Sequence, residues 1–469
     1  MTHIVNRLCF ELRCPDEGTA FLSRQAFAET FQPEIVEIID KVCSQYLSEE
    51  EWLRLDTLEI DLGRFSQHLL DRDFALLFRR QFEKELLKKL DLSTIEQRKV
   101  TKERSRMELF AYFLLQGTLP WWAVETEADI DTLARELYLR HPAGLRSFFY
   151  EQRKNPTLWT RAAFQLSDTA IRAIISLFRE LQDAERLLSQ WALTSNILDV
   201  RFSVALRQAL LRHAPELFSE GEVVPPASDI LSLIVNEIVP KLTGAMTSPA
   251  SITPGAPWSI AENASVEVSA VPLTPGASDR EASHSLMSSG RVLTHAEFES
   301  DKEQARYPLH HAGLILLAPF FMKLFDACGL LDGRQWKDKE AQYQAIHLLG
   351  FLSTGSTKVP EYSLVLEKIC CGIAIEEPIP LDAGLQEYQL DESRALLASV
   401  IEHWKVLKNT SIDGLRETFL KRDGLLSVKE EGWLLQVERK TLDVLLDSLP
   451  WGYSTVLLPW NDYHIHVEW

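Results

Sequence analysis

The chain has 469 residues, of which 46% are hydrophobic and 9% aromatic, and its formal net charge is −19. This length exceeds a single ordinary core and predicts about two to four domains with apolar interiors. The negative charge disfavours nucleic acids and anionic membrane surfaces as partners, because both would repel the protein.

The sequence has no recognisable targeting or membrane segment. Its first residues, MTHIVNRLCFELRCP, lack a basic region followed by an apolar one, so we expect no secretory signal. The longest apolar stretch, Ala312 to Phe321, has the length of a core helix and predicts no membrane span. The cysteines follow no framework spacing, so we expect buried thiols at Cys9, Cys14, Cys43, Cys328, Cys370 and Cys371.

Residues 1–105 are predicted to form a small N-terminal α+β domain. Ile4–Arg13 alternates apolar and polar residues, which is typical of a strand. A helix with Pro33 in its first turn follows, and Arg54–Gly63 alternates again. An amphipathic helix then runs from Phe65 to near Leu90. The order of these patterns predicts a β-α-β-α unit.

Residues 106–243 are predicted to form a helical domain, and residues 244–300 a linker. Gly244–Gly290 consists mostly of Gly, Ala, Ser, Thr and Pro, which bury too little apolar surface to fold alone. An ordered long loop is the alternative interpretation. Candidate helices of the helical domain are SRMELFAYFLLQ, DIDTLARELYLRH, TAIRAIISLFRELQ and FSVALRQALLRH.

Residues 301–469 are predicted to form a C-terminal helical domain that ends in a small β element. A hairpin is expected from Leu425–Val428 and Trp433–Glu438, and two extended pieces from Ser454–Leu458 and Tyr463–Trp469. The chain as a whole is therefore predicted to be α+β and mostly α-helical. Helices are expected in YPLHHAGLILLAPFFMKLFDACGLLDG, AQYQAIHLLGFLSTG, EYSLVLEKICCGI and ESRALLASVIEHWKVLKNTSIDGLRETFLKRDG, the last interrupted near Asn409, with Ser411 or Asp413 as N-cap.

The C-terminal segment carries large aromatic side chains beside turns that contain proline. That much apolar surface is unstable in water, so two interpretations remain. The segment packs as edge strands on the C-terminal domain, or it forms an interface for another subunit. The candidate partner-contact residues are Trp433, Trp451, Trp460 and Trp469.

The sequence contains no GxGxxG, HExxH, CxxC or GxSxG motif. GFLSTGSTK, at Gly350–Lys358, differs from a phosphate-binding loop because two residues separate its last glycine from the lysine. A helical pattern also precedes it, so Gly355 is predicted to end a helix. Cys370 and Cys371 point apart on a helix and would chelate a metal poorly.

His464, His466 and Glu468 alternate along a predicted strand, so their side chains would share one side. This pattern fits a metal site, and it equally fits the solvated polar face of a strand. The residues as a whole favour a soluble interaction protein that is not an enzyme, with no catalytic residue, no cofactor and no metal site.

Distinctive motifs stand at both ends of the chain. Near the start are VNRLCFELRCPDEGTAF and WLRLDTLEIDLGRF, and near the end are IEHWKVLKNTSIDGLRETFLKRDGLL and GWLLQVERKTLDVLLDSLPWGYSTVLLPW, followed by HVEW. In this order they resemble the two ends of the contractile injection system tape measure protein family. The resemblance is weaker in the helical middle and absent from the linker.

The resemblance implies a structural component of a phage-tail-like particle, in which a contractile sheath drives an inner tube through a membrane. A tape measure lies in the tube lumen during assembly and sets the length of the tube from the baseplate hub. The implied locations are the cytoplasm during assembly and then the particle. The implied partners are inner tube proteins, baseplate hub and spike proteins, the tube terminator and sister copies in the lumen, with no nucleic acid and no direct membrane anchor.

An alternative function is an assembly chaperone or scaffold for hub or tube subunits. Such a protein would be absent from the finished particle, whereas a tape measure would remain in it.

Overall fold

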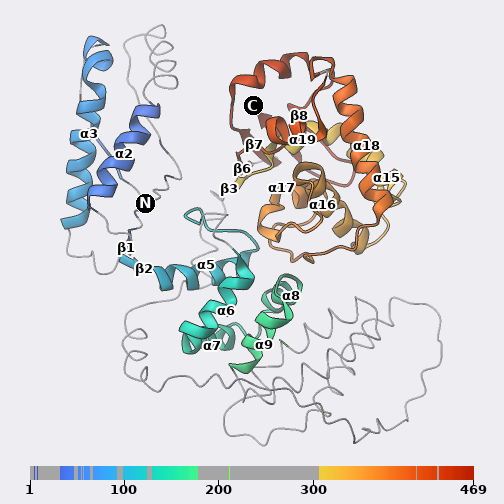
Figure 1. Ribbon diagram of the computed structural model, residues 1–469, viewed down its shortest axis with the longest axis horizontal. Coiled ribbons are helices and arrows are strands. Elements are labelled where there is room, and N and C mark those ends of the chain that lie inside the picture. The colour runs from blue at the N-terminus through green and yellow to red at the C-terminus, as the bar shows by residue number, and fades with distance from the viewer. Residues whose placement is uncertain are drawn as a thin grey trace, which may run out of the picture. The chain divides into compact units, whose positions relative to one another are not determined.

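In the computed structural model the chain divides into two compact units, whose elements are drawn in Figure 1. The first unit comprises Met1–Leu109 and Pro120–Ala128, and the second comprises Phe110–Leu119 and Asp129–Trp469. The structure describes residues 32–46, 51–53, 58–63, 67–91, 99–123, 129–177, 306–407, 409–429 and 432–469, together with Val5, Leu8, Leu55 and Leu211.

Several predicted elements lie outside the described residues, apart from the single positions just named. They are the strand Ile4–Arg13, the helix FSVALRQALLRH and the linker 244–300. These elements, and the four predicted domain boundaries, stay predictions.

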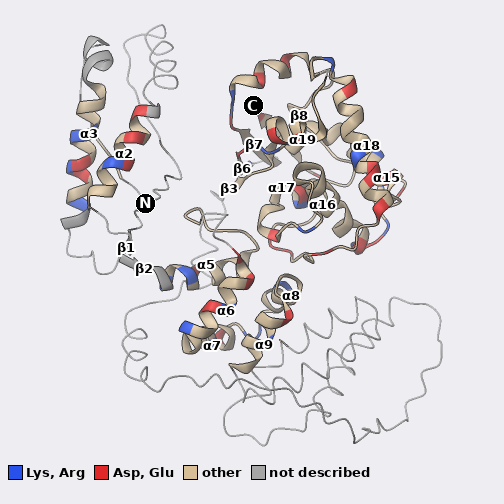
Figure 2. Ribbon diagram, in the orientation of Figure 1, with Lys and Arg blue, Asp and Glu red and all other residues tan. Residues whose placement is uncertain are grey.

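In the described residues of the first unit, helices α2 (Gln32–Tyr46) and α3 (Gln67–Asp91) lie side by side, as Figure 1 shows. The long helix predicted to begin near Phe65 is thereby confirmed. Phe74, Phe78 and Phe82 recur every four residues, so their rings stack along one face of α3, with centroids 6.0 and 5.7 Å apart. Acidic and basic residues share other positions of the same helix (Figure 2). The buried core is Ile35, Ile39, Val42, Phe74, Phe78, Phe82 and Leu86.

The described residues of Arg54–Gly63, which was predicted as a strand, are Leu55 and 58–63, and their apolar side chains pack on this core. Apolar positions are half-buried and the acidic positions between them are exposed, so the predicted alternation is confirmed. The strand prediction itself is wrong, because the described residues of this segment have no strand assignment. The strands among the described residues of this unit are β1 (Glu51–Leu53) and β2 (Lys99–Thr101), which pair in antiparallel register.

In the described residues up to Leu177, the helical part of the second unit begins within α5 and continues through shorter helices. Side-chain caps explain where three of these begin: Asp129, Asn155 and Ser167 each accept hydrogen bonds from backbone N–H groups of the first turn. The helices are α5 (Lys102–Gln116), α6 (Ile130–Arg140), α7 (Pro142–Glu151), α8 (Pro156–Gln165) and α9 (Asp168–Ser176).

The C-terminal part of the second unit combines helices with a five-stranded sheet, which confirms the predicted α+β, mostly helical class. None of the helices in the described segments is long and apolar enough to span a bilayer. The helices are η4 (Ala312–Phe320), α15 (Phe321–Ala327), α16 (Lys339–Thr354), η5 (Glu361–Ser363), α17 (Val365–Cys370), α18 (Glu387–His403), η6 (Lys405–Leu407), α19 (Ile412–Leu415), η7 (Arg416–Leu420) and η8 (Thr441–Ser448). The strands are β3 (Arg306–Leu309), β4 (Leu331–Asp332), β5 (Gln335–Trp336), β6 (Gly424–Lys429), β7 (Gly432–Val437), β8 (Thr455–Val456) and β9 (His464–Glu468).

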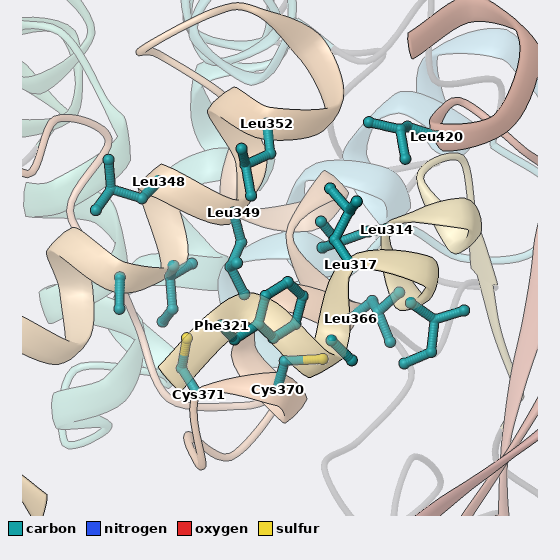
Figure 3. Close-up of a cluster of buried hydrophobic side chains, with 14 of the residues drawn as sticks. Leu314, Leu317, Phe321, Leu348, Leu349, Leu352, Leu366, Cys370, Cys371 and Leu420 are labelled. Atoms are coloured by element: carbon teal, nitrogen blue, oxygen red, sulfur yellow. The ribbon is translucent and has the colours of Figure 1, made fainter. Parts of the chain in front are cut away.

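Helix α16 is the centre of the C-terminal core. Every residue from Ala345 to Ser353 is buried, which is typical of a helix enclosed on all sides. Gly355 ends the helix in the left-handed conformation at φ +79°, as predicted, and Ser411 caps α19 as predicted. Figure 3 shows the buried side chains of this core, which come from α16, η4, the start of α15, α17 and η7. The labelled residues are Leu314, Leu317, Phe321, Leu348, Leu349, Leu352, Leu366, Cys370, Cys371 and Leu420.

The long apolar helix predicted from Tyr307 to Gly329 or Gly333 is wrong in its first half. Arg306–Leu309 is strand β3, which pairs with β6, and it lies at an edge of the sheet. An edge tolerates Pro308, which has no N–H to donate. After His310 and His311, Ala312–Phe320 form the 3₁₀ helix η4, and Pro319 near its end has no N–H to donate to a helical hydrogen bond.

The sheet has the strand order β3-β6-β7-β9-β8. The predicted hairpin is confirmed as β6 and β7, and both predicted extended pieces contain strands, β8 and β9. The terminal strand β9 was expected at an edge, but it lies inside the sheet, parallel to β7 and antiparallel to β8. The reason is that β8 folds back onto β9 and becomes the edge strand itself.

Candidate functional site

Two of the four candidate tryptophans anchor turns onto the C-terminal core. The indole N–H of Trp451 donates to the carbonyl oxygen of Leu316 at 2.9 Å. That of Trp460 donates to the carbonyl oxygen of Cys370 at 2.7 Å, and its ring centroid lies 4.7 Å from that of Trp336. Both side chains are half-buried, so the turns that carry them are held by internal contacts.

The other two candidates hold the terminal strand. The indole N–H of Trp469 donates to Asp443 Oδ2 at 2.9 Å, and Asp443 also pairs with the buried Arg422 at 2.6 Å. Arg439 Nη2 donates to the carbonyl oxygen of Trp469 at 2.8 Å. Trp433, on β7, packs beside aromatic rings of β3 and of the segment before β9. All four tryptophans are half-buried internal anchors, and their role as partner contacts stays a proposal.

His464, His466 and Glu468 lie exposed on β9, with Ile465 buried between the histidines. Glu468 accepts a hydrogen bond from Gln436 Nε2 at 2.7 Å, and the two imidazole rings stack with centroids 6.2 Å apart. This arrangement fits the solvated face of a strand. Within the described segments, no group of three or more His, Cys, Asp and Glu residues is placed to hold a metal ion.

A buried charged cluster, which we call the junction, joins helix α8 to residues 361–381 of the same unit. It consists of Arg161, Glu361 and Lys368, whose side chains are each at most 1% exposed. Arg161 Nε donates to both carboxylate oxygens of Glu361, at 3.1 and 3.2 Å. Lys368 Nζ donates to Oε1 of the same carboxylate at 2.6 Å. The Glu361 carboxylate therefore forms ion pairs with both Arg161 and Lys368.

Backbone carbonyl oxygens accept further hydrogen bonds from the two cations of the junction. Buried charged groups need such partners, because they have lost their contacts with water. Lys368 Nζ donates to two of these oxygens, at 2.8 and 2.7 Å, and Arg161 Nη1 donates to a third at 2.6 Å. Arg161 Nη2 donates to a fourth. Burial lowers the pKa of Lys368, and the Glu361 carboxylate opposes that shift. These carbonyls are those of Ile375, Glu377, Leu114 and Glu376.

Neutral groups of α8 extend the junction. Gln165 Nε2 donates to the carbonyl oxygen of Ile379 at 2.8 Å, and Gln165 Oε1 accepts from the backbone N–H of Glu361 at 3.3 Å. The backbone N–H of Leu381 donates to the carbonyl oxygen of Phe164 at 3.3 Å. Helix α8 thus binds the segment 361–381 along its last turn as well as at Arg161.

Sequence analysis missed the junction, although a signal for it exists. Arg161 shares the buried face of α8 with Leu158 and Ala162, at a position where helical spacing calls for an apolar residue. Glu361 and Lys368, seven residues apart, likewise lie in the apolar pattern EYSLVLEKICC. A long charged side chain at a predicted core position is rarely buried without a partner of opposite charge. Each of these three residues therefore predicts a buried, oppositely charged partner elsewhere in the chain.

The prediction of buried thiols is confirmed for Cys328, Cys370 and Cys371, and the fourth described cysteine is half-buried. Burial raises the pKa of Cys328 to about 12, and it raises the pKa of both thiols of the adjacent pair. These groups are protonated at neutral pH and are poor nucleophiles. Cys9 and Cys14 lie outside the described residues.

His347 connects α16 to the segment that forms the junction, and we expect it to weaken the fold in acid. Its Nε2 lies 2.7 Å from the carbonyl oxygen of Pro380, so this nitrogen carries the proton of the neutral ring. Burial lowers its pKa. In the unfolded chain the ring takes up a proton below about pH 6.5, whereas the folded ring resists protonation, so stability falls as pH drops below that value.

The measurement is urea unfolding at pH 7.5 and 5.5 for the wild type and for His347→Gln. The wild type should lose up to about 1.4 kcal/mol more between the two pH values than His347→Gln does. His403→Gln, which changes an exposed ring, is the control and should keep the wild-type difference. Equal losses in the wild type and His347→Gln would show that the ring is not held neutral.

Comparison with known proteins places the whole chain in one family. The family model described as contractile injection system tape measure protein matches residues 2–469. A search of curated proteins found no match, and a search of solved structures found none either. Because the match includes both ends, the helical middle and the segment between them, the chain belongs to the contractile injection system tape measure protein family.

Proposed function

We propose that this protein sets the length of the inner tube of a contractile injection particle during assembly from the baseplate hub. The observation that carries the proposal is the family match, which spans residues 2–469. The family is structural, and its members act together with other components of the injection system. We propose inner tube, baseplate hub, spike and terminator proteins as the partners, and the cytoplasm and then the particle as the locations.

Physical reach supports the proposal if the packed helices separate inside the tube. As one continuous α-helix, a chain of this length spans about 700 Å. Gly244–Gly290 alone spans about 155 Å at ~3.3 Å per residue when fully extended. When amphipathic helices separate, they lose the apolar contacts between them. Their apolar faces stay buried if they then pack on sister copies or on the lumen wall. We propose two states, a packed free chain and an extended chain in the tube.

The half-buried tryptophans are the proposed contacts to partners. Three of their indole N–H groups already donate within the C-terminal core. A partner would therefore contact the exposed parts of the rings of Trp433, Trp451, Trp460 and Trp469 by apolar packing.

Removing part of the linker should shorten the tube. Deletion of ~20 residues from Gly244–Gly290 should shorten it by about 30 Å if this segment is helical in the tube, and by about 66 Å if it is extended. Electron microscopy of purified particles measures the change. The control has the same residues of this segment in a different order, which keeps chain length and should keep tube length.

Mass spectrometry of the same particles separates this function from that of an assembly chaperone. A tape measure should be present in every finished particle. A chaperone should be absent from finished particles and present only in assembly intermediates.

A further inference from the structure

The two cations of the junction differ in how they are connected to Glu361. Lys368 lies seven residues from Glu361 in sequence, and its other two acceptors, the carbonyl oxygens of Ile375 and Glu377, belong to the same local segment. Arg161 comes from a helix 200 residues away. The segment 361–381 therefore forms a complete charged site by itself, and Arg161 is added to it from outside.

This asymmetry decides what remains when α8 leaves. Without Arg161, the Glu361 carboxylate still has Lys368 as its partner, so the C-terminal part keeps a neutral buried pair and not an unpaired charge. The released guanidinium returns to water, where its hydration offsets the lost hydrogen bonds. The carbonyl oxygens of Glu376 and Ile379, which α8 had bonded, become accessible to water along the exposed face. Departure of α8 thus leaves no buried charge without a partner.

Gly117 shows that the contact between Arg161 and Glu361 is closely packed. It adopts φ +78° at the end of α5, and a Cβ added there would lie 2.5 Å from Glu361 Oε1 and 2.8 Å from Arg161 Nη2. A glycine is therefore needed at this position both for its backbone conformation and for the approach of the ion pair.

We infer that helix α8 docks reversibly on residues 361–381 through Arg161, and that it separates from the C-terminal part while the Glu361–Lys368 pair keeps that part folded. The use of this docking, as the first step by which the chain opens on entering the tube, rests on the proposed function.

Hydrogen exchange of the full-length protein, read by mass spectrometry, tests the inference with Arg161→Met. Amides of α8, and the N–H of Leu381 that donates to Phe164, should exchange roughly 10- to 100-fold faster, as expected for loss of a charge-assisted hydrogen bond. Amides of β6, β7 and β9 should keep their wild-type rates. Arg172→Met, which removes an exposed arginine of α9, is the matched control and should change neither set.

A second variant tests the same contact without changing a charge. Gly117→Ala should also speed exchange in α8 and leave the sheet unchanged. Gly384 has a similar φ of +66° with no atom within 4 Å of an added Cβ, so Gly384→Ala controls for backbone strain alone and should leave α8 unchanged.

Two results would overturn the inference. One is loss of protection in α8 and in the sheet together, or failure of Arg161→Met to fold, which would make the junction part of one cooperative core. The other is unchanged exchange of α8 in both variants. Because these measurements use the free chain, their outcome is independent of whether chain length sets tube length.

Discussion

Replacing Glu361 by Gln should lower the free energy of unfolding by about 3–5 kcal/mol, because it removes one member of a buried charged cluster. Arg161 and Lys368 would then both lose the carboxylate, whose oxygens now lie 2.6 to 3.2 Å from their nitrogens, and Lys368 would stay buried without a charged partner. Glutamine fills nearly the same volume, so the loss reports charge and not packing. Urea unfolding followed by tryptophan fluorescence measures it, since Trp404 is buried in the same unit.

The matched control is Glu387→Gln, at a carboxylate that is 72% exposed and pairs with Arg394 at 2.9 Å. Exposed pairs of this kind contribute little, so its unfolding midpoint should stay close to that of the wild type. A Glu361 variant as stable as this control would mean that the cations of the junction are neutral or hydrated in the folded protein.

Gly313→Ala should be the most damaging of the small substitutions, with a loss of at least about 3 kcal/mol. A Cβ at this position of η4 would overlap the carbonyl oxygen of Phe419 and lie 2.7 Å from its carbonyl carbon and 3.0 Å from the Cα of Leu420. These are backbone atoms, which cannot rotate away as a side chain does. The helix η4 and the π-helix η7 would have to move apart, which would disrupt the packing of the core that Figure 3 shows.

Gly144→Ala provides the comparison for this prediction. Gly144 lies in helix α7, and an added Cβ meets no atom within 4 Å. The same change should therefore stabilise the protein by up to ~1 kcal/mol, because alanine favours a helix over glycine. Thermal unfolding of both variants checks the contrast, and similar effects in the two would contradict the close approach of η4 to η7.

Local patterns predicted those elements whose signals lie within a few residues. The amphipathic pattern from Phe65 to near Leu90 predicted α3, and Gly355 and Ser411 marked a helix end and a helix start. The hairpin of β6 and β7 also followed from adjacent residues. In each case the bonds that form the element join residues close in the chain.

Elements that depend on distant partners were predicted less well. Pairing of Leu309 with Gly424 makes β3 a strand, and nothing near Leu309 announces a partner so far along the chain. The terminal strand is interior because its residue Ile465 pairs with Val456 on one side and with Trp433 on the other. The alternation of Ile465 and Val467 shows which residues face the core, but it does not show how many neighbours the strand has.

The junction escaped prediction for a related reason. Arg161, Glu361 and Lys368 each read locally as a charged residue on a helix, where solvent exposure is the common outcome. The contact of Arg161 with Glu361 depends on how α8 packs against a segment 200 residues away. The tryptophans, by contrast, were identified from their size and the turns beside them, either as packing on the C-terminal domain or as contacting another subunit. The structure shows them packed against the C-terminal core.

The central claim is that the length of this chain sets the length of the inner tube. The most direct test measures tube length as a function of chain length. A series of insertions and deletions within Gly244–Gly290, produced in the intact injection system and measured by electron microscopy, should give a straight line. Its slope should lie between about 1.5 Å per residue for a helical segment and about 3.3 Å per residue for an extended one. Tubes of one constant length across the series would contradict the account.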